Sequence, residues 1–271
     1  MTRPNLTRDW LAETRNKGPL VHHLTNLVTI NDCANVTLCL GASPVMSDSH
    51  EEADQLTALA SALVLNMGTL NPPQVEAMVK AGLAAHQKGI PVVFDPVGAG
   101  ATPYRQQTAK RIMDEVKPTI VKGNLAEIKF LVGLATTQKG VDNLDSGGAT
   151  EAVLALAKTR HCIAAATGEV DFISDGVAVW SVTGGRAELG RVTGTGCMTA
   201  SLIGGLAGAG ADALTAAILG ILVMDRAGEI AGKVFKDGQG MGHFRTGLFD
   251  AIGQLKDIDL LATERVRLVQ S

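Results

Sequence analysis

Residues 192–200, with the sequence Val-Thr-Gly-Thr-Gly-Cys-Met-Thr-Ala, have the composition of an anion-binding turn. Glycines and small residues lead directly into the apolar segment 201–209, which is typical of a helix. A glycine-rich helix start presents unpaired backbone N–H groups and the positive end of the helix dipole. Gly194 and Gly196 would let this backbone approach phosphate oxygens, with Cys197 beside the transferred group.

Cys197 allows more than one interpretation. A helix start lowers the pKa of a thiol, so we expect a partial thiolate that could take the proton of an attacking hydroxyl. Two other roles stay open: an inert small side chain that lines the site, and a covalent nucleophile, for which no His or Asn signature is visible. The stretch could also be a tight turn around a buried structural cysteine.

The overall composition is that of a globular protein that binds small ligands. The 271 residues are 46% hydrophobic, and the formal net charge is −3. No block of Lys and Arg occurs and aromatic residues make up 3%, which argues against nucleic acid as a partner. Four cysteines lack C-x-x-C spacing and residues 1–17 lack an apolar run, so we expect a cytoplasmic protein without structural zinc. Charges interrupt the apolar stretch 211–230, which predicts a core helix and no membrane segment.

Apolar strands alternate with helices along the chain, which predicts an α/β fold in a single domain spanning residues 1–271. Such alternation forms a mostly parallel central sheet with helices on both faces. The expected strands are 20–24, 43–46, 62–68, 90–94, 118–121 and 162–166, followed by a hairpin of 171–174 and 177–182. The expected helices are 6–17, one ending at Gly41, 48–59, 72–88, 102–116, a short one at Glu127, and 149–159. A polar stretch lies at 140–148, and after the hairpin we expect only the helices 195–208, 211–231 and 242–255.

The residues directly after the predicted strands are polar, glycine-rich or charged. Right-handed crossovers place the carboxyl ends of parallel strands at one edge of the sheet, where such sheets bind ligands. We therefore expect a site at this edge, formed by Asn26, Met46, Asn66 to Gly68, Asp95, Lys122 to Asn124, Glu127, Thr167 and Gly168.

Two carboxylates and one lysine in this set suit phosphoryl transfer. Asp95 and Glu127 offer the oxygen ligands that Mg²⁺ takes when it binds with a nucleotide. Lys122 adds a positive charge suited to phosphate. Taken singly, Asp95 could cap a turn, Glu127 could be an ordinary acid in the first turn of a helix, and Lys122 could be a surface charge. Together with the glycine-rich turn, they favour phosphate transfer.

Several motifs taken together resemble the hydroxyethylthiazole kinase family of thiamine salvage. The motifs are Gly-Thr-Gly-Cys at 194–197, Asp-Pro-Val-Gly-Ala at 95–99, Val-Lys-Gly-Asn at 121–124 with Glu127, His-x-Leu-Thr-Asn at 22–26, Asn-Asp at 31–32 and Ser-Pro-Val-Met at 43–46. The likeness extends from His22 to about Leu255. The Gly-Thr-Gly stretch alone is shared with the wider ribokinase-like kinases.

This resemblance implies a ribokinase-like three-layer fold without a lid. It also implies ATP- and Mg²⁺-dependent phosphorylation of the hydroxyl of 4-methyl-5-(2-hydroxyethyl)thiazole. The residues expected to face this alcohol are Met46, Gly194, Asn26 and Gly68. The residues expected to bind ATP are Lys122, Thr167, Asn124 and Gly196.

The same resemblance assigns Asp95 and Glu127 to Mg²⁺ and its waters. Cys197 stands where ribokinase-like enzymes usually carry an aspartate base. The family forms homotrimers with the substrate pocket at subunit interfaces, so a neighbouring subunit would replace a lid in excluding water.

Other functions stay open at this point. One is another small-alcohol kinase of the same fold, acting on a hydroxymethylpyrimidine or a sugar. A second is an ATP-dependent repair dehydratase on the same scaffold, and a third is a non-catalytic binding module. A nicotinamide oxidoreductase is disfavoured, because G-x-G-x-x-G does not follow the first strand.

Overall fold

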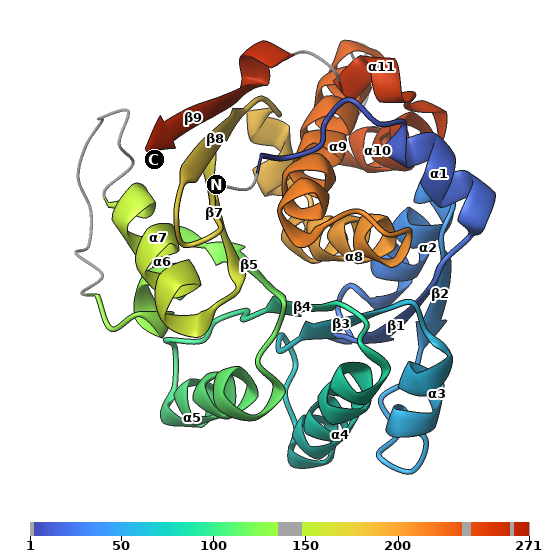
Figure 1. The fold of residues 1–271 in the computed structure, drawn as a ribbon. Helices are drawn as coiled ribbons and strands as arrows, with labels where there is room; N and C mark the ends of the chain where they lie inside the picture. Colours follow the sequence, from blue (N-terminus) through green and yellow to red (C-terminus); the bar gives the residue numbers. More distant parts are fainter. Residues whose placement is uncertain (1–2, 135–147, 235–239, 261–262, 271) are drawn as a thin grey trace.

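A nine-stranded sheet forms the centre of the computed structural model, which describes residues 3–134, 148–234, 240–260 and 263–270. Its strand order is β2-β1-β3-β4-β5-β6-β7-β8-β9 (Figure 1). The strands are β1 (Leu20–Leu24), β2 (Ser43–Met46), β3 (Ala62–Asn66), β4 (Val92–Asp95), β5 (Ile120–Asn124), β6 (Ile163–Thr167), β7 (Val170–Ser174), β8 (Val179–Thr183) and β9 (Val266–Gln270). β1 to β6 are parallel and β7 to β9 antiparallel, which confirms the expected mostly parallel sheet.

The winding of the chain reverses at β1. This strand pairs with β2 on one side, with Leu20 opposite Ser43, and with β3 on the other, with Val21 opposite Ala62. Open parallel sheets bind ligands at such a reversal, beyond the carboxyl ends of the strands. The loop after β1 and the end of β3 therefore border the expected ligand crevice.

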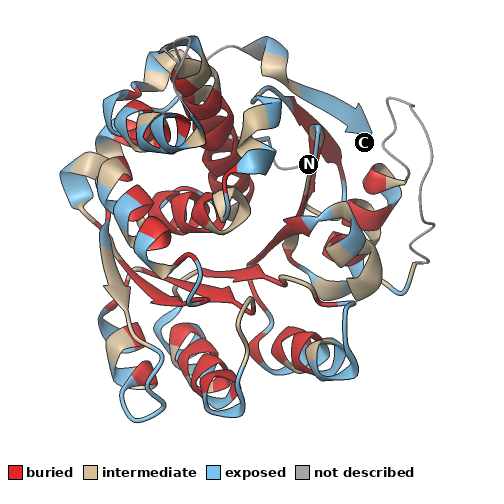
Figure 2. Ribbon diagram, turned by 180° about the vertical axis from the view of Figure 1, so that it is seen from behind, coloured by how far each residue is buried: buried red, intermediate tan, exposed pale blue. Residues whose placement is uncertain are grey.

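Helices cover both faces of the sheet and give three layers (Figures 1 and 2). The helices on one face are α1 (Trp10–Lys17), α2 (Ile30–Leu40), α8 (Thr195–Gly208), α9 (Ala213–Val234) and α10 (Met241–Gln254). Those on the other are α3 (Ala53–Leu59), α4 (Pro72–Lys88), α5 (Pro103–Arg111), α6 (Leu125–Leu131) and α7 (Ala149–Arg160).

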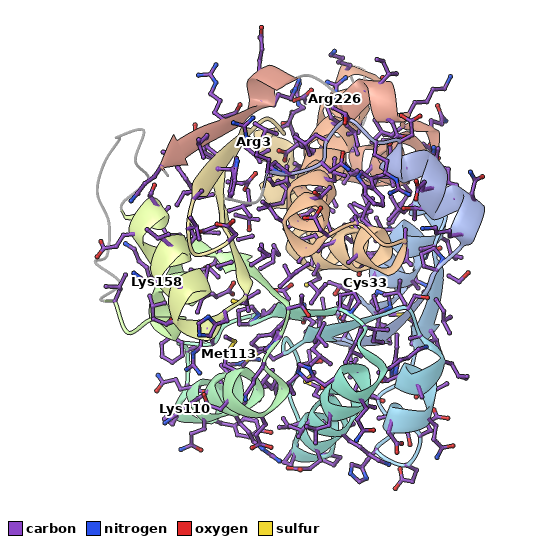
Figure 3. The ribbon with its side chains drawn as sticks, in the orientation of Figure 1. Arg3, Cys33, Lys110, Met113, Lys158 and Arg226 are labelled. Carbon is purple, nitrogen blue, oxygen red and sulfur yellow. The ribbon has the colours of Figure 1, made fainter. Side chains whose placement is uncertain are left out.

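Alternating residues of the buried strands supply the two cores. In β3, Ala62 and Val64 pack among α8 and α9, whereas Leu63 and Leu65 pack against the opposite set of helices. Figure 3 shows that side chains fill the space between the sheet and the helices on both faces. Because β3 is covered on both faces, all of its residues 62–65 are apolar.

Local sequence sets the ends of several helices. The side chain of Asn71 accepts a hydrogen bond from the Gln74 N–H at 2.9 Å, and Pro72 occupies the first turn of α4. The same helix ends at Gly89, whose φ of 75° is the left-handed conformation that glycine adopts most easily. Both boundaries of α4 agree with the sequence prediction.

The structure departs from the predicted elements elsewhere. We expected only helices after the hairpin, but 266–270 forms β9, which pairs with β8. β9 has largely exposed residues, so its sequence lacks the apolar pattern by which a strand is found. α1 begins at Trp10 and α3 at Ala53, later than predicted, and the helix predicted at 102–116 ends in a π-helical turn. Residues 140–147 of the expected polar stretch lie outside the described residues.

The remaining short helix, α11 (Asp257–Leu260), precedes the last strand. Every strand within the described ranges belongs to the one sheet, so no strand pair stands apart from it there as a lid. Among the residues that the structure describes, no helix combines the length and the apolar character that a membrane crossing requires.

Candidate active site

A chain of hydrogen bonds joins the residues at the carboxyl ends of β1, β3 and β4. The side-chain amide of Asn26 donates to Asn66 Oδ1 at 2.9 Å, and the amide of Asn66 donates to Asp95 Oδ2 at 2.8 Å. These side chains are 3%, 1% and 2% exposed, in that order. Asn66 and Asp95 lie opposite each other in the register of β3 and β4. The structure thus brings Asn26 and Asp95 together where the sheet winding reverses.

Cys197 reaches the same cluster from the first turn of α8. The Asn26 amide approaches Cys197 Sγ at 3.4 Å. Burial raises the pKa of the Cys197 thiol, and the nearby Asp95 carboxylate raises it further. The expected partial thiolate is therefore wrong, because lost hydration and a neighbouring negative charge outweigh the helix start. Cys197 is a neutral thiol beside the carboxylate.

Asp95 is a buried carboxyl group, and its neighbours act on its pKa in opposite directions. Burial raises its pKa to about 6, and the charge of Glu127 acts in the same direction. The positive charge of Lys122 and the contacts with Asn66 and Cys197 lower the pKa. Above about pH 6 the site therefore holds a nearly dehydrated negative charge, which is suited to a cation.

Lys122 extends from β5 to the glycine turn before Cys197. Its ammonium group donates to Gly196 O at 3.2 Å, and the side chain is 3% exposed. A Cβ at position 196 would lie 3.0 Å from Lys122 Nζ, so the ammonium group packs closely against this glycine. Gly194 has a φ of 88°, and a Cβ at this position would overlap the side chain of Thr29. The turn and the lysine form one positively charged corner.

Glu127 is held by two backbone N–H groups at the start of α6. Its Oε1 accepts from Gly98 N and its Oε2 from Asn124 N, both at 2.8 Å. Asn124 Oδ1 in turn accepts from Glu127 N at 2.9 Å, which completes a capping box. Glu127 is therefore a first-turn helix acid, and its carboxylate also lies close enough to Asp95 to raise the pKa of that residue.

Thr167 lies one strand beyond Lys122. It pairs with Asn124 in the register of β5 and β6, and its hydroxyl donates to Gly123 O at 3.2 Å. Lys122 and Thr167 share the face toward α8 and α9, because the residues two positions before them lie in that core. Asp171 on β7 lies on the same face, and sequence reasoning missed it because it begins a hairpin strand.

Gly68 lies against Asn26. A Cβ at position 68 would be 2.6 Å from Asn26 Cβ, and the Gly68 N–H donates to Asn66 Oδ1 at 3.0 Å. The side-chain oxygen Oδ1 of Asn26 accepts from the backbone N–H and the hydroxyl of Thr29, at 3.0 and 3.1 Å. Thr29 thus contacts both Asn26 and the turn at Gly194. The sequence did not indicate this role, because Thr29 lies several residues beyond the end of β1.

Arg105 of α5 is a further residue that sequence reasoning missed. Its guanidinium donates to Met67 O at 2.6 Å and to Val97 O at 2.7 Å, and it also contacts Gly68 O. One side chain therefore fastens the loop after β3 to the loop after β4. An arginine on an amphipathic helix usually faces solvent, so the sequence carried no sign of this contact.

Met46 is the expected site residue that lies apart from this cluster. It ends the outermost strand β2, is half-buried, and lies opposite His23 of β1. β1 separates it from β3, so Met46 lies two strand spacings, roughly 10 Å, from Val64, and Asn66 is two residues further along β3. Within the described chain, Met46 belongs to the edge of the sheet rather than to the Asn26–Asp95 cluster.

The donor set suits a divalent cation that is held together with phosphate groups. Within the described residues, no three His, Cys, Asp or Glu side chains cluster as ligands of a metal ion. Mg²⁺ needs no such cluster, because it commonly binds one or two carboxylates plus phosphate oxygens and water. Asp95 fits this pattern, since its buried carboxyl group accepts the Asn66 amide at Oδ2 and lies near the ammonium group of Lys122.

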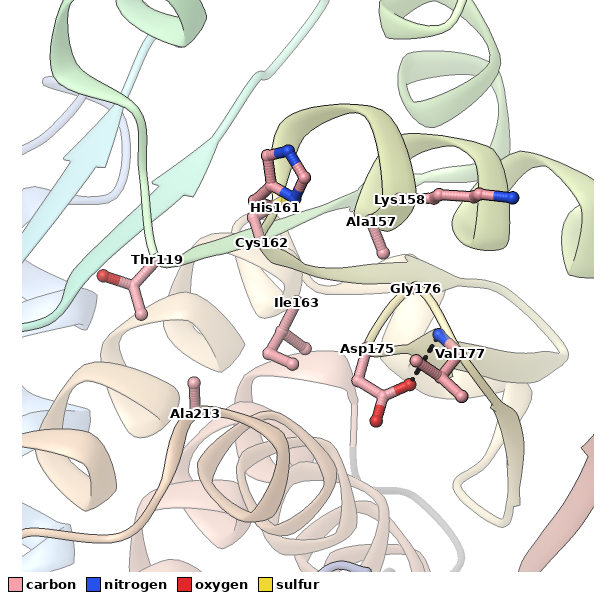
Figure 4. Close-up of a pocket in the computed structure, with 10 residues that line it drawn as sticks. All are labelled: Thr119, Ala157, Lys158, His161, Cys162, Ile163, Asp175, Gly176, Val177 and Ala213. Atoms are coloured by element: carbon pink, nitrogen blue, oxygen red, sulfur yellow. Dashed lines mark hydrogen bonds between the residues drawn. The ribbon is translucent and has the colours of Figure 1, made fainter. Parts of the chain in front are cut away.

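A separate cavity of about 440 Å³ lies at the opposite edge of the sheet (Figure 4). Its lining includes Thr119 and Ile163 at the amino ends of β5 and β6, and the turn between β7 and β8. The side chain of Lys158 points away from the centre of this cavity in Figure 4, and Asp175 is engaged by the Val177 N–H at 2.9 Å. His161 and Cys162 also line this cavity.

The fold and the site together define a small-molecule kinase of the ribokinase-like class. The model of the hydroxyethylthiazole kinase family matches residues 11–257. The chain is 47% identical to the hydroxyethylthiazole kinase of Alkaliphilus oremlandii over 252 residues, which cover 92% of this chain and 93% of that protein. It is 44% identical to the hydroxyethylthiazole kinase of Methanocorpusculum labreanum over 253 residues, which cover 93% and 94%. The chain belongs to the hydroxyethylthiazole kinase family.

Solved structures agree with this membership. The hydroxyethylthiazole kinase protein from Pyrococcus horikoshii OT3 superposes with a TM-score of 0.84 and 36% identity, covering 96% of this chain and 98% of that one. The pyridoxal kinase of Staphylococcus aureus in complex with AMP-PCP and pyridoxal has a TM-score of 0.61 at 15% identity, covering 93% and 99%. This more distant structure shows the fold alone. The expected ribokinase-like three-layer fold is confirmed.

Proposed function

We propose that the chain transfers the terminal phosphoryl group of ATP to the hydroxyl of 4-methyl-5-(2-hydroxyethyl)thiazole. The observation that carries this proposal is the convergence of Asn26, Asp95, Lys122 and Cys197 at the reversal point of the sheet. This convergence occurs in a chain whose relatives are named for the phosphorylation of that alcohol.

The nucleotide side of the proposed site is its positively charged corner. Lys122 would bind phosphate oxygens as a point charge, and the backbone N–H groups around Gly196 would add donors at the start of α8. Thr167 and Asn124 lie next to Lys122 across β5 and β6 and would contact the remainder of ATP. Asp95 and Glu127 would hold Mg²⁺, which, when bound, neutralises charge on the phosphates.

The alcohol side of the proposed site is the cluster around Asn26. Asn26 is fixed by several hydrogen bonds and would orient the thiazole alcohol, with Gly68 packed against Asn26 and Gly194 packed against Thr29. Cys197 would line the position of the attacking hydroxyl as a neutral thiol. Because phosphoryl transfer of this kind depends mainly on positioning and charge stabilisation, a weak base at this point suffices.

The direct test is to incubate the purified chain with ATP, Mg²⁺ and the thiazole alcohol. We expect ADP release that depends on the alcohol, together with a phosphorylated alcohol detected by mass spectrometry. Hydroxymethylpyrimidine and a panel of sugars serve as competing substrates for the alternative kinases. No turnover of the thiazole alcohol, or ATP hydrolysis coupled to dehydration without a phosphorylated product, would contradict the proposal.

A homotrimer with active sites between subunits is the assembly that we propose. Support comes from the β2 edge, where Met46 is half-buried and the nearby loop after β1 exposes Leu27 and Val28, at 68% and 66%. A neighbouring subunit placed on this edge would cover these side chains and bring Met46 into a closed pocket. Light scattering coupled to size exclusion should give three chain masses, and a monomer with full activity would contradict this assembly.

The compartment that we propose is the cytoplasm. ATP is available there, and the cysteines at 33, 39, 162 and 197 are free thiols in the structure. Fractionation of cells that express the protein would test this assignment.

A further inference from the structure

Asn66 lies beneath the two halves of the proposed site and contacts both of them. Its Nδ2 donates to Asp95 Oδ2 at 2.8 Å, while its Oδ1 accepts from Asn26 Nδ2 at 2.9 Å and from the Gly68 N–H at 3.0 Å. With 1% of its surface exposed, Asn66 acts through these neighbours rather than on a ligand. One amide group therefore connects the alcohol side with the carboxylate on the metal side.

The orientation of the Asn66 amide is fixed by its partners. The backbone N–H of Gly68 can only donate, so it requires the carbonyl oxygen of Asn66 on its side. The NH₂ group of Asn66 must then face Asp95, where an oxygen acceptor completes the pair. The direction of donation runs from Asn26 through Asn66 to Asp95.

The two neighbours depend on Asn66 to different degrees. Asn26 Oδ1 also accepts from the N–H groups of Val28 and Thr29 and from the Thr29 hydroxyl, at 3.0 to 3.1 Å. Asn26 therefore keeps its place when Asn66 is altered. The Asp95 carboxylate has fewer partners: its Oδ2 accepts from the Asn66 amide, and it also contacts Cys197.

We infer that Asn66 is a positioning residue for the reaction. By holding Oδ2, it fixes the rotation of the Asp95 carboxylate relative to Asn26 and Cys197. This inference rests on the proposed function. Partners that orient a metal-binding carboxylate commonly change metal affinity or activity by about 10- to 100-fold when they are removed.

Two substitutions separate the donor from the acceptor role of Asn66. Asn66→Asp keeps an acceptor for Asn26 and Gly68 but removes the donor to Asp95, whereas Asn66→Ala removes both. We expect kcat to fall about 10- to 100-fold in both variants, with the KM for the thiazole alcohol changed by less than about threefold. Wild-type kcat in Asn66→Asp, or a loss confined to KM, would overturn the inference.

A double-mutant cycle with Asp95→Asn tests whether Asn66 acts through Asp95. Residues that act through one another are non-additive, so Asn66→Ala should change kcat by less than about threefold in the Asp95→Asn background. Additive losses would overturn the inference. Ser174→Ala is the matched control, because it removes a buried hydrogen bond to Ala178 O at 2.8 Å at the opposite edge of the sheet. It should lower the melting temperature and leave kcat unchanged.

Binding of Mn²⁺ in the presence of ADP, followed by electron paramagnetic resonance, provides a readout without turnover. We expect Asn66→Ala to weaken Mn²⁺ binding about tenfold relative to the wild type and to Ser174→Ala. Equal Mn²⁺ affinities would overturn the inference. If the wild type binds Mn²⁺ with ADP but does not phosphorylate the thiazole alcohol, the proposed substrate is wrong, and the Mn²⁺ comparison still decides the role of Asn66.

Discussion

Two buried acidic regions of this molecule differ in what surrounds them. Asp95 is 2% exposed, receives the Asn66 amide, and lies near the ammonium group of Lys122. Asp171 of β7 and Asp225 of α9 are also buried, but Asp225 Oδ2 has no hydrogen-bond partner within the described structure. Burial raises the pKa of Asp95 to about 6, of Asp171 to about 7 and of Asp225 to about 8.

The difference lies in the neighbours that compensate each charge. Beside Asp95, a cation and a directed amide keep the ionised form accessible near neutral pH. Beside Asp225, the facing groups include the acids Asp171 and Glu229, and the cation Arg265 is engaged by Glu229 at 3.1 Å. Burial alone therefore does not single out Asp95, which differs from Asp225 in having an organised donor and a cation beside it.

The largest expected effect is the loss of activity in Asp95→Asn. Removing the carboxylate takes away the charge that faces the cation, so kcat should fall by about 10²- to 10³-fold. The melting temperature is measured on the same variant, because Lys122 loses a buried counter-charge when the carboxylate is removed. Steady-state kinetics with saturating ATP and alcohol measure the change. Asp114→Asn, which alters a partly exposed ion pair with Arg160, is the control that should retain wild-type kcat.

A smaller loss is expected when the glycine turn is altered. In Gly194→Ala, the new Cβ overlaps the Thr29 side chain and occupies a φ of 88°, so kcat should fall about 10- to 100-fold as α8 shifts. Gly89→Ala is the matched variant, because Gly89 has a φ of 75° but no atom within 4 Å of the added Cβ. It should lower stability by about 1 kcal/mol and leave kcat intact. Equal kinetic losses in both would mean that backbone strain, rather than the site, is responsible.

The acidic pair of β7 and α9 should control stability rather than rate. The pKa of Asp225 is about 8 in the folded chain and about 3.9 when unfolded, so the unfolded chain releases the proton first as pH rises. The stabilising contribution is complete below about pH 4, decreases steadily above that pH, and is lost once pH has risen through about 8. Asp225→Asn supplies a neutral amide and should raise the unfolding free energy at pH 8 by about 1–2 kcal/mol.

Urea unfolding at pH 5 and pH 8 measures this effect. The gain in Asp225→Asn should be larger at pH 8 than at pH 5, and kcat should stay unchanged. A gain of equal size at both pH values would show that the carboxyl does not titrate in this range. The charged groups that face Asp225 are Asp171 and Glu229, which raise its pKa, and Arg265, which lowers it.

The smallest effect is expected at Cys197. Because burial and Asp95 keep the thiol neutral, Cys197→Ser replaces one neutral group by another, and kcat should fall less than about tenfold. The dependence of kcat on pH should keep the wild-type shape. A loss as large as that in Asp95→Asn would instead assign the thiol a chemical step of its own.

Much of this architecture could be predicted from sequence because buried strands and capped helices leave local patterns. The apolar run 62–65 predicts a strand covered on both faces, and Pro72 with Gly89 marks both ends of α4. β9 could not be found in this way, because its residues are mostly exposed and its partner β8 is more than 80 residues away. Pairing between distant segments leaves no periodic signal in a single sequence.

The same reasoning explains which parts of the candidate site were found. Because the carboxyl ends of parallel strands meet at one edge of a sheet, the sequence predicted that Asn26, Asp95 and Lys122 lie close together. It could not give the pKa of Cys197, because the thiol meets Asp95 from another element, about 100 positions away in the chain. Arg105 was missed because its role depends on which loops fold over α5, and this is a property of the assembled structure.

The clamp that Arg105 forms has a consequence for motion in the molecule. Its guanidinium group donates to backbone carbonyls of both loops at the carboxyl ends of the strands, at Met67, Gly68 and Val97. The loops after β3 and β4 must therefore move together, and neither can open independently of the other while Arg105 binds both. We therefore expect any conformational change on ligand binding to occur on the other side of the site, at the beginning of α8.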